Sequence, residues 1–69
     1  MLDEFIPQIE KLQSQGAIVL VKWDGERAVN RCTVVVTRKD TDYQFHRDSD
    51  NIQSALRDAL SDYSAKHQN

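Results

Sequence analysis

Elements that often stabilise very small domains are scarce in this sequence. The 69 residues include one cysteine, one proline and two glycines. A single cysteine cannot form an intramolecular disulfide, and there are no further thiols for a zinc cluster. Low glycine and proline with 29% charged residues exclude collagen-like and disordered compositions. A domain of this size with no disulfide normally works in a reducing compartment, so we expect a cytoplasmic protein.

Long hydrophobic runs are also missing. The longest apolar run is Ala17–Val21, whereas a membrane span needs about 20 residues. The acidic stretch Met1–Phe5 lacks the basic and apolar regions of a signal peptide. We therefore expect a soluble protein with no membrane contact. The length predicts a single domain over residues 1–69, with a frayed tail at 65–69.

A strong excess of charge of one sign is absent. Nine basic and eleven acidic residues give a net charge of −2. Residues 22–47 hold six basic and four acidic side chains, so this middle segment is weakly positive between two acidic ends. Domains that bind nucleic acid mainly through its phosphates are usually strongly basic. The overall charge therefore speaks against that class.

Two segments have the periodicity of amphipathic helices. In the first, Leu2, Phe5, Ile9 and Leu12 recur at three- and four-residue steps, and Ile6 widens this apolar stripe. Asp3 is a candidate cap, but Pro7 allows the regular helix to begin as late as Ile6. Gly16 suits the left-handed position that follows a helix.

The second helix is expected over Asp50–Lys66. Asp50 followed by Gln53 resembles a capping box, with Asp in place of Ser or Thr. The acidic residues before it and the basic residues near its end suit the helix dipole. Its apolar stripe consists of Ile52, Ala55, Leu56, Ala59, Leu60 and Tyr63.

Between the helices, the pattern changes to that of strands. Ala17–Trp23 is rich in β-branched residues and ends at Asp24-Gly25, a hairpin signal. We expect a second strand over 28–37 and a third over 43–46. A two-residue turn at Asp24-Gly25 would pair Trp23 with Glu26, and a two-residue turn at Lys39-Asp40 would start the next hairpin.

This pairing assigns each side chain to a face, because neighbouring strand residues point to opposite sides. The expected core face carries Ala17, Val19, Val21, Trp23, Ala28, Cys32, Val34, Val36, Tyr43 and Phe45, with Glu26 and Asn30 as its polar members. The opposite face carries Ile18, Leu20, Lys22, Val29, Arg31, Thr33, Val35, Thr37, Gln44 and His46. The predicted fold is α+β, with order α-β-β-β-α: a three-stranded antiparallel meander with both helices packed on one face.

No group of residues in the sequence indicates catalysis. Cys32 and His46 are the one pair that could act as nucleophile and base, but they fall on opposite faces. His46, Asp48 and Asp50 are spaced for a weak metal site, yet the two aspartates are explained by their place at a helix start. We therefore expect no enzyme activity, no cofactor and no metal.

A nucleic-acid-binding module is one hypothesis. The α-β-β-β-α order is similar to that of double-stranded RNA-binding domains over nearly the whole chain, in element order and length. That resemblance implies phosphate contacts from lysines at the start of the second helix, where this chain has the acidic stretch Arg47–Asn51. The candidate nucleic-acid contacts are Arg27, Arg31, Arg38, Lys39 and Arg47.

The leading hypothesis is a small adaptor or inhibitor-type protein that binds a protein partner, or itself as a homodimer, through the open sheet face. A contiguous apolar patch indicates an interface, whereas scattered apolar side chains are normal on any surface. A β-branched surface chosen for strand propensity is the alternative explanation. The candidate interface residues are Ile18, Leu20, Val29, Arg31, Thr33 and Val35.

Overall fold

A computed structural model describes residues 2–67 and has the predicted element order. A 3-10 turn, Leu2–Phe5, leads into helix α1. The elements that follow the turn are α1 (Ile6–Ser14), β1 (Ile18–Trp23), β2 (Cys32–Arg38), β3 (Tyr43–Ser49) and α2 (Ile52–Lys66). The three strands form one antiparallel sheet in the order β1-β2-β3. The predicted α+β class and the helix-β-β-β-helix order are confirmed.

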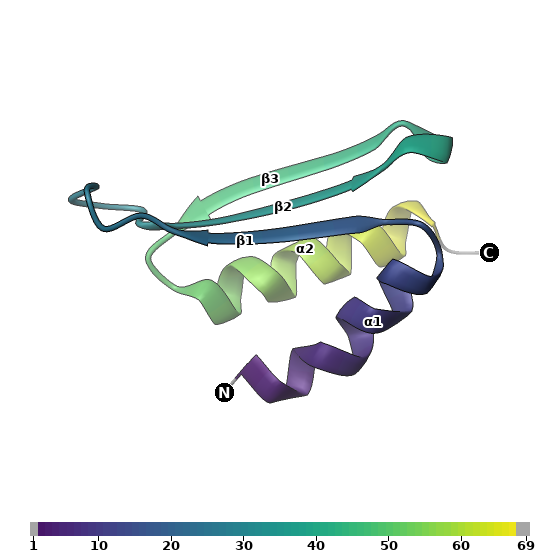
Figure 1. The fold of residues 1–69 in the computed structure, drawn as a ribbon, viewed down its shortest axis with the longest axis horizontal. Coiled ribbons are helices and arrows are strands. Elements are labelled where there is room, and N and C mark those ends of the chain that lie inside the picture. The colour runs from purple at the N-terminus through teal and green to yellow at the C-terminus, as the bar shows by residue number, and fades with distance from the viewer. Residues whose placement is uncertain (1, 68–69) are drawn as a thin grey trace.

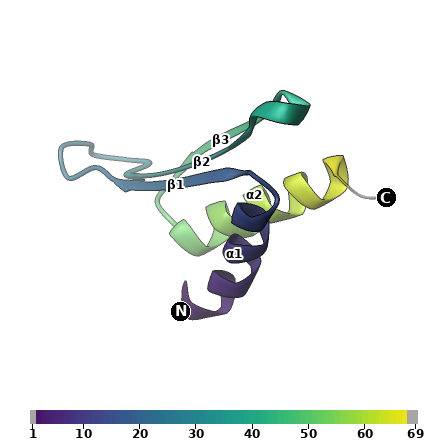
Figure 2. The ribbon, with the colours of Figure 1, turned by 45° about the vertical axis from the view of Figure 1, so that its right-hand side comes forward.

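Both helices lie on the same side of the sheet, below it in Figure 1 and also in the turned view of Figure 2. Helix α2 packs across β2 and β3, and α1 packs against β1. The described part of the chain contains no helix that is both long and apolar enough to cross a membrane.

The end of α1 shows why its sequence stops the helix there. The Gly16 N–H donates to the carbonyl oxygen of Gln13 and the Ala17 N–H to that of Leu12, both at 3.0 Å. Gly16 has a φ of +91°, the left-handed conformation that this paired arrangement requires. The chain thereby turns directly from α1 into β1, which positions β1 as an outer strand.

The expected strand register is wrong in the first hairpin. Trp23 pairs with Cys32, six residues beyond the expected Glu26, and residues 24–31 form a long loop. Gly25 does not have the positive φ that a tight type I′ turn needs, and the Asp24 side chain instead accepts a hydrogen bond from the Glu26 N–H at 2.9 Å. The observed register places Val19 opposite Val36, where the expected one placed it opposite Asn30. Pairing of the two β-branched runs is therefore favoured over the shortest turn.

The second hairpin is also longer than expected. Arg38 pairs with Tyr43, so four residues connect β2 to β3 in place of the two at Lys39-Asp40. Three of them form a 3-10 turn, and Asp42 takes a left-handed conformation that aspartate tolerates. Asp40 folds back in this turn to bind the Arg38 guanidinium at 2.8 Å.

The assignment of side chains to faces largely survives these corrections, because both registers move by an even number of residues. Ala17, Cys32, Val34, Val36 and Tyr43 are buried as expected, and Val19, Val21 and Phe45 are half-buried. Two apolar residues of the expected core face are not in the core. Trp23 is 60% exposed at the end of β1, and Ala28 lies exposed in the long loop together with Glu26 and Asn30. In helix α1, Ile6 is 48% exposed.

Helix α2 differs from its prediction at its start, whereas its last residue, Lys66, is as predicted. Asn51, and not Asp50, caps it: the Asn51 Oδ1 accepts a hydrogen bond from the Ser54 N–H at 3.0 Å. At the other end the helix is regular to Lys66, and the His67 N–H still donates to the Tyr63 carbonyl oxygen. The frayed tail expected at 65–69 therefore overlaps the last two helical residues, Ala65 and Lys66, and residues 68–69 lie outside the described range.

Replacement of Gly16 tests the role of its left-handed conformation. A Cβ at this position would meet no atom within 4 Å, so the cost of Gly16→Ala should come only from the backbone strain of a side chain held at positive φ. We expect it to lower the free energy of unfolding by about 1 kcal/mol. Urea denaturation of Gly16→Ala and Gly25→Ala checks this, because Gly25 is equally open but has no positive φ. Equal effects of the two substitutions would contradict the assignment.

Candidate functional site

The sheet face opposite the helices carries neighbouring apolar side chains on β1 and β2. Ile18 and Leu20 on β1 are 57% and 59% exposed. Val35 on β2 pairs directly with Leu20 and is half-buried, and Thr33 follows two residues before it. Within residues 2–67 no helix covers this face, which is the upper side of the sheet in Figure 1. Four of the six candidate interface residues are therefore brought together on the open face.

The other two candidates, Val29 and Arg31, lie elsewhere. Both belong to the 24–31 loop, since β2 begins only at Cys32. Val29 is 65% exposed there, and the Arg31 N–H donates to an Asp50 carboxylate oxygen at 3.2 Å. Their assignment to the second strand, and thereby to the open face, is wrong. The sequence predicted too early a start for the second strand because residues of the loop before Cys32 are partly apolar.

The β3 side of the same face is polar. The Thr33 hydroxyl donates to Asp48 at 2.7 Å, and His46 and Arg27 each approach that carboxylate at 3.4 Å. Hydrogen bonding from Thr33, and then the nearby charges of Arg27 and His46, lower the pKa of Asp48 below its ordinary value. The open face therefore divides into an apolar half on β1 and β2 and a charged border along β3.

The five basic residues considered for nucleic-acid binding are dispersed. Arg27 and Arg31 lie in the 24–31 loop, and Arg38 and Lys39 lie at the opposite end of β2. Arg47 pairs across the strands with Val34, so it belongs to the helix side, where it binds Asp58 at 2.8 Å. Arg27 and Arg38 also contact carboxylates. The structure does not bring these five side chains into one patch.

Cys32 and His46 occupy opposite sides of the sheet. Cys32 is buried on the helix side, with 7% of its surface exposed, and His46 is exposed on the open face. Asp50 is engaged by the Arg31 N–H, and the His46 ring lies 3.4 Å from the Asp48 carboxylate. Among residues 2–67 no group of three or more His, Cys, Asp or Glu side chains is arranged to hold a metal ion.

A second cluster, at the end of α2, was not anticipated from the sequence. The Tyr63 hydroxyl accepts a hydrogen bond from Arg38 and donates one to Gln15, each at 2.8 Å. The His67 ring stacks on Tyr63 with ring centres 4.0 Å apart, and its Nε2 lies 2.9 Å from the Thr41 hydroxyl. The cluster ties α1, β2 and α2 together. The one available signal was the four-residue spacing of Tyr63 and His67, which places both on one helix face.

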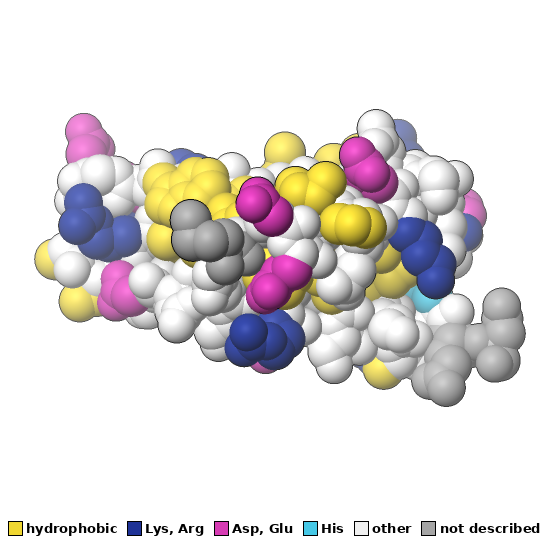
Figure 3. Space-filling view, turned by 90° about the horizontal axis from the view of Figure 1, so that it is seen from below, with side chains coloured by type: hydrophobic (Ala, Val, Ile, Leu, Met, Phe, Trp, Pro, Cys, Tyr) yellow, Lys and Arg dark blue, Asp and Glu magenta, His cyan; other side chains and the backbone are white. Residues whose placement is uncertain are grey.

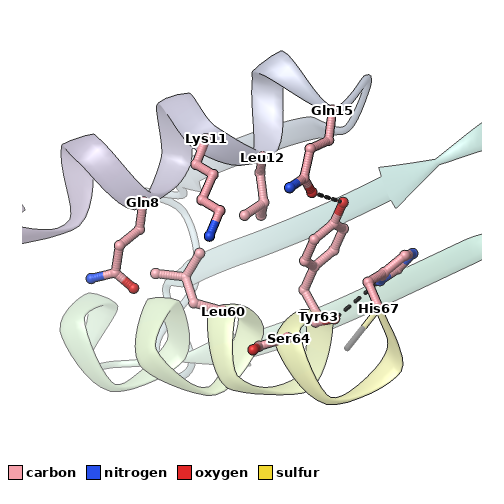
Figure 4. Close-up of a pocket in the computed structure, with 8 residues that line it drawn as sticks. All are labelled: Gln8, Lys11, Leu12, Gln15, Leu60, Tyr63, Ser64 and His67. Carbon is pink, nitrogen blue, oxygen red and sulfur yellow. Dashed lines mark hydrogen bonds between the residues drawn. The ribbon is translucent and has the colours of Figure 1, made fainter. Parts of the chain in front are cut away.

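Beside this cluster, a shallow groove of about 350 Å³ separates α1 from α2. Figure 4 shows Gln8, Lys11 and Gln15 on the α1 side, Ser64 on α2, and His67 beside Tyr63 just past the end of α2. The Lys11 ammonium lies over the groove, while Leu12 and Leu60 form its apolar floor. Most of these polar side chains are exposed to solvent, so the groove has the character of a hydrated surface furrow.

Tyr43 lies at the same end of the molecule as the Tyr63 cluster. Its ring contacts Tyr63 edge-on at 5.3 Å, and its hydroxyl donates to the Asp62 carboxylate. Burial, followed by this hydrogen bond, raises the pKa of the Tyr43 phenol above its ordinary value. Asp40 shows the opposite effect, since hydrogen bonding from Arg38 lowers its carboxyl pKa. These groups are held by internal partners, which is typical of structural polar networks.

Comparison of the chain with family models, with curated proteins and with solved structures finds no match. The argument for function therefore depends on the geometry of the residues themselves. Two features stand out: the apolar half of the open sheet face and the polar cluster around Tyr63. The first presents side chains to solvent, while the second uses its polar groups internally.

Removal of one hydroxyl tests whether the Tyr63 cluster is structural. Tyr63→Phe loses the hydrogen bonds to Arg38 and Gln15, and we expect it to lower the free energy of unfolding by about 1–2 kcal/mol. Urea denaturation of Tyr63→Phe, Gln15→Ala and the double variant gives the coupling between the two side chains. If the two substitutions lower the free energy of unfolding additively, a direct hydrogen bond between Tyr63 and Gln15 is contradicted.

The lowered pKa values of Asp40 and Asp48 predict acid sensitivity. Both carboxylates titrate below their unfolded value of 3.8, so their contribution is complete above that pH and is lost as the pH falls through the folded-state values. Thr33→Val removes the largest cause of the Asp48 shift and should reduce the acid-induced loss. Unfolding free energies measured from about pH 7 to about pH 2.5 check this. An unchanged pH profile in Thr33→Val would show that this bond does not shift the pKa.

Proposed function

We propose that this chain is a small non-catalytic interaction domain of the cytoplasm that binds a protein through its open sheet face. Adaptor and inhibitor-type roles both fit this description. The observation that carries the proposal is the apolar surface formed by Ile18, Leu20 and Val35, which we call the β1–β2 patch. Two large aliphatic side chains more than half exposed, side by side on one strand, are unusual for a surface without a partner.

The energetics of burial support this use of the patch. Complete burial of an aliphatic side chain of this size contributes about 1.5–3 kcal/mol. Since Ile18 and Leu20 are a little over half exposed, a partner that covers them would gain about 1–2 kcal/mol from each. The backbone beneath is fixed by the pairs Ile18–Thr37 and Leu20–Val35, so little conformational freedom is lost on binding. The patch is thus pre-organised for contact.

The helix side of the molecule offers a weaker surface of this kind. Figure 3 shows that hydrophobic side chains emerge there in several groups, with acidic and basic side chains between them. Charged residues at an interface centre must be desolvated, and this opposes binding. On the open face the nearest charges are Lys22 at the end of β1 and the border along β3, so the centre of the β1–β2 patch is free of charge.

A matched pair of variants tests the proposal. Leu20→Lys places a charge in the centre of the β1–β2 patch, and Gln44→Lys places the same charge on β3 of the same face. Capture from extracts of the native host should show at least about a tenfold loss of bound protein for Leu20→Lys and no loss for Gln44→Lys. Circular dichroism establishes that both variants are folded. Equal binding by both would refute the proposed face.

A further inference from the structure

We propose that two copies of this chain pair through the outer edges of their β1 strands, antiparallel to each other, to form one continuous six-stranded sheet. The inference deepens the proposed function and rests on it, since it names a second copy as the occupant that extends the open face. It starts from a difference between the two edges of the sheet.

The two outer strands are protected to very different degrees. Strand β3 carries His46, Arg47 and Asp48 in succession, and charged side chains are a usual defence of an exposed sheet edge. Strand β1 reads Ile-Val-Leu-Val-Lys-Trp, with Lys22 as its single charge and no proline. Within the described residues no strand pairs with the outer edge of β1, and α1 lies below β1 on the helix side in Figure 1. An unprotected apolar edge of this length is a template for strand addition.

The backbone groups that face outward can be identified from the hairpin. The Asp24 N–H donates to the Arg31 carbonyl oxygen at 2.7 Å, which extends the β1–β2 register by one pair. In an antiparallel ladder, hydrogen-bonded pairs alternate with pairs whose backbone groups point away. Even-numbered residues of β1 therefore bond to β2. The N–H and C=O groups of Val19, Val21 and Trp23 point to the free edge.

These outward groups define the register in which a second copy fits. The two β1 strands must pair through their odd-numbered residues. Val19 then forms a hydrogen-bonded pair with Val21 of the second copy, and the twofold axis passes beside Leu20. This register uses the whole segment Ala17–Trp23, whereas an axis at Val21 would leave both Ala17 and Ile18 unpaired. Leu20 then faces its own counterpart in a pair without backbone bonds, the type whose side chains lie closest. The two β1–β2 patches become one surface across the junction.

Charge and side-chain size fit the same arrangement. The two copies of Lys22 fall at opposite ends of the junction, four residues and hence about 13 Å apart, beyond the screening length of about 8 Å. Each lies opposite Ile18, whose surface can pack against the lysine stem. On the helix side, Trp23 lies opposite the buried Ala17 and diagonal to half-buried Val19 of the second copy, so Val19 provides the accessible apolar surface. The pairing thus gives a partner to an indole that is 60% exposed in the single chain.

Sedimentation equilibrium of the purified chain tests the association directly. We expect a dimer at about 100 µM protein, with Leu20→Lys monomeric at that concentration and Gln44→Lys still dimeric. The two lysine variants carry the same charge on the same face, but on β1 and β3 respectively. A monomeric wild-type chain at this concentration would overturn the proposal, as would equal dissociation of the two variants.

Cysteine cross-linking tests the register. On a Cys32→Ala background, Leu20→Cys should form a disulfide-linked dimer under mild oxidation, because directly opposite Cβ atoms lie about 4.5–5.5 Å apart. Lys22→Cys, on the same strand and face, should remain uncross-linked since its two copies are about 13 Å apart. Comparable cross-linking of the two would rule out this register. If the background variant fails to fold, native Cys32 can be retained because it is buried.

The outcomes separate this inference from the proposed function. If the wild-type chain is monomeric while Leu20→Lys still loses a captured protein, dimerisation through β1 is wrong and the open face remains a binding surface. If Leu20→Lys alters neither captured protein nor oligomeric state, both proposals are wrong. A dimer that is broken by Leu20→Lys and locked by Leu20→Cys supports both.

Discussion

The burial of β2 between its two neighbouring strands and α2 is the constraint on which the rest of the structure depends. Val34 and Val36 have no exposed surface, and they are covered by a helix that presents Ala55 and Ala59 to the core. Small residues on a helix allow close approach to a sheet, so α2 can cover both β2 and β3. With α2 centred there, only the short helix α1 remains to cover β1. The outer strand is consequently half-buried on one face and bare on the other.

This constraint also explains which parts of the fold could be predicted from sequence. Element type and face follow from local periodicity, and these hold for α1, α2 and the core side of β2. Register does not follow from local signals, because the Asp24-Gly25 turn competes with the pairing of two valine-rich runs. Pairing Val19 and Val21 with Val36 and Val34 brings more apolar surface together than a two-residue turn could. The length of the 24–31 loop is therefore determined by the pairing of β1 with β2, and not by the turn preference of Asp24-Gly25.

The candidate site was predictable to the extent that it depends on strand alternation. Ile18, Leu20 and Val35 share the open face because even register shifts preserve the face of every residue. Val29 was wrongly predicted to lie on this face, because it continues the alternating apolar pattern although it belongs to the loop before β2. The Tyr63 cluster depends on contacts across 25 to 48 residues of sequence, from Tyr63 to Arg38 and to Gln15. No local pattern encodes these two contacts, whereas the stacking of His67 on Tyr63 follows from their four-residue spacing.

The stabilising polar contacts and the proposed interaction surface thereby lie on opposite sides of one small sheet. The helix side and the Tyr63 end use their polar groups to join α1, β2 and α2, so a ligand there would have to displace existing bonds. The β1 edge and its open face have backbone and apolar groups without partners in the single chain. A domain this small cannot cover both faces of three strands with 24 helical residues, nine in α1 and fifteen in α2. The proposed extension of the sheet by a second copy would bury more apolar surface and would satisfy the outward N–H and C=O groups of β1, with no further length of chain.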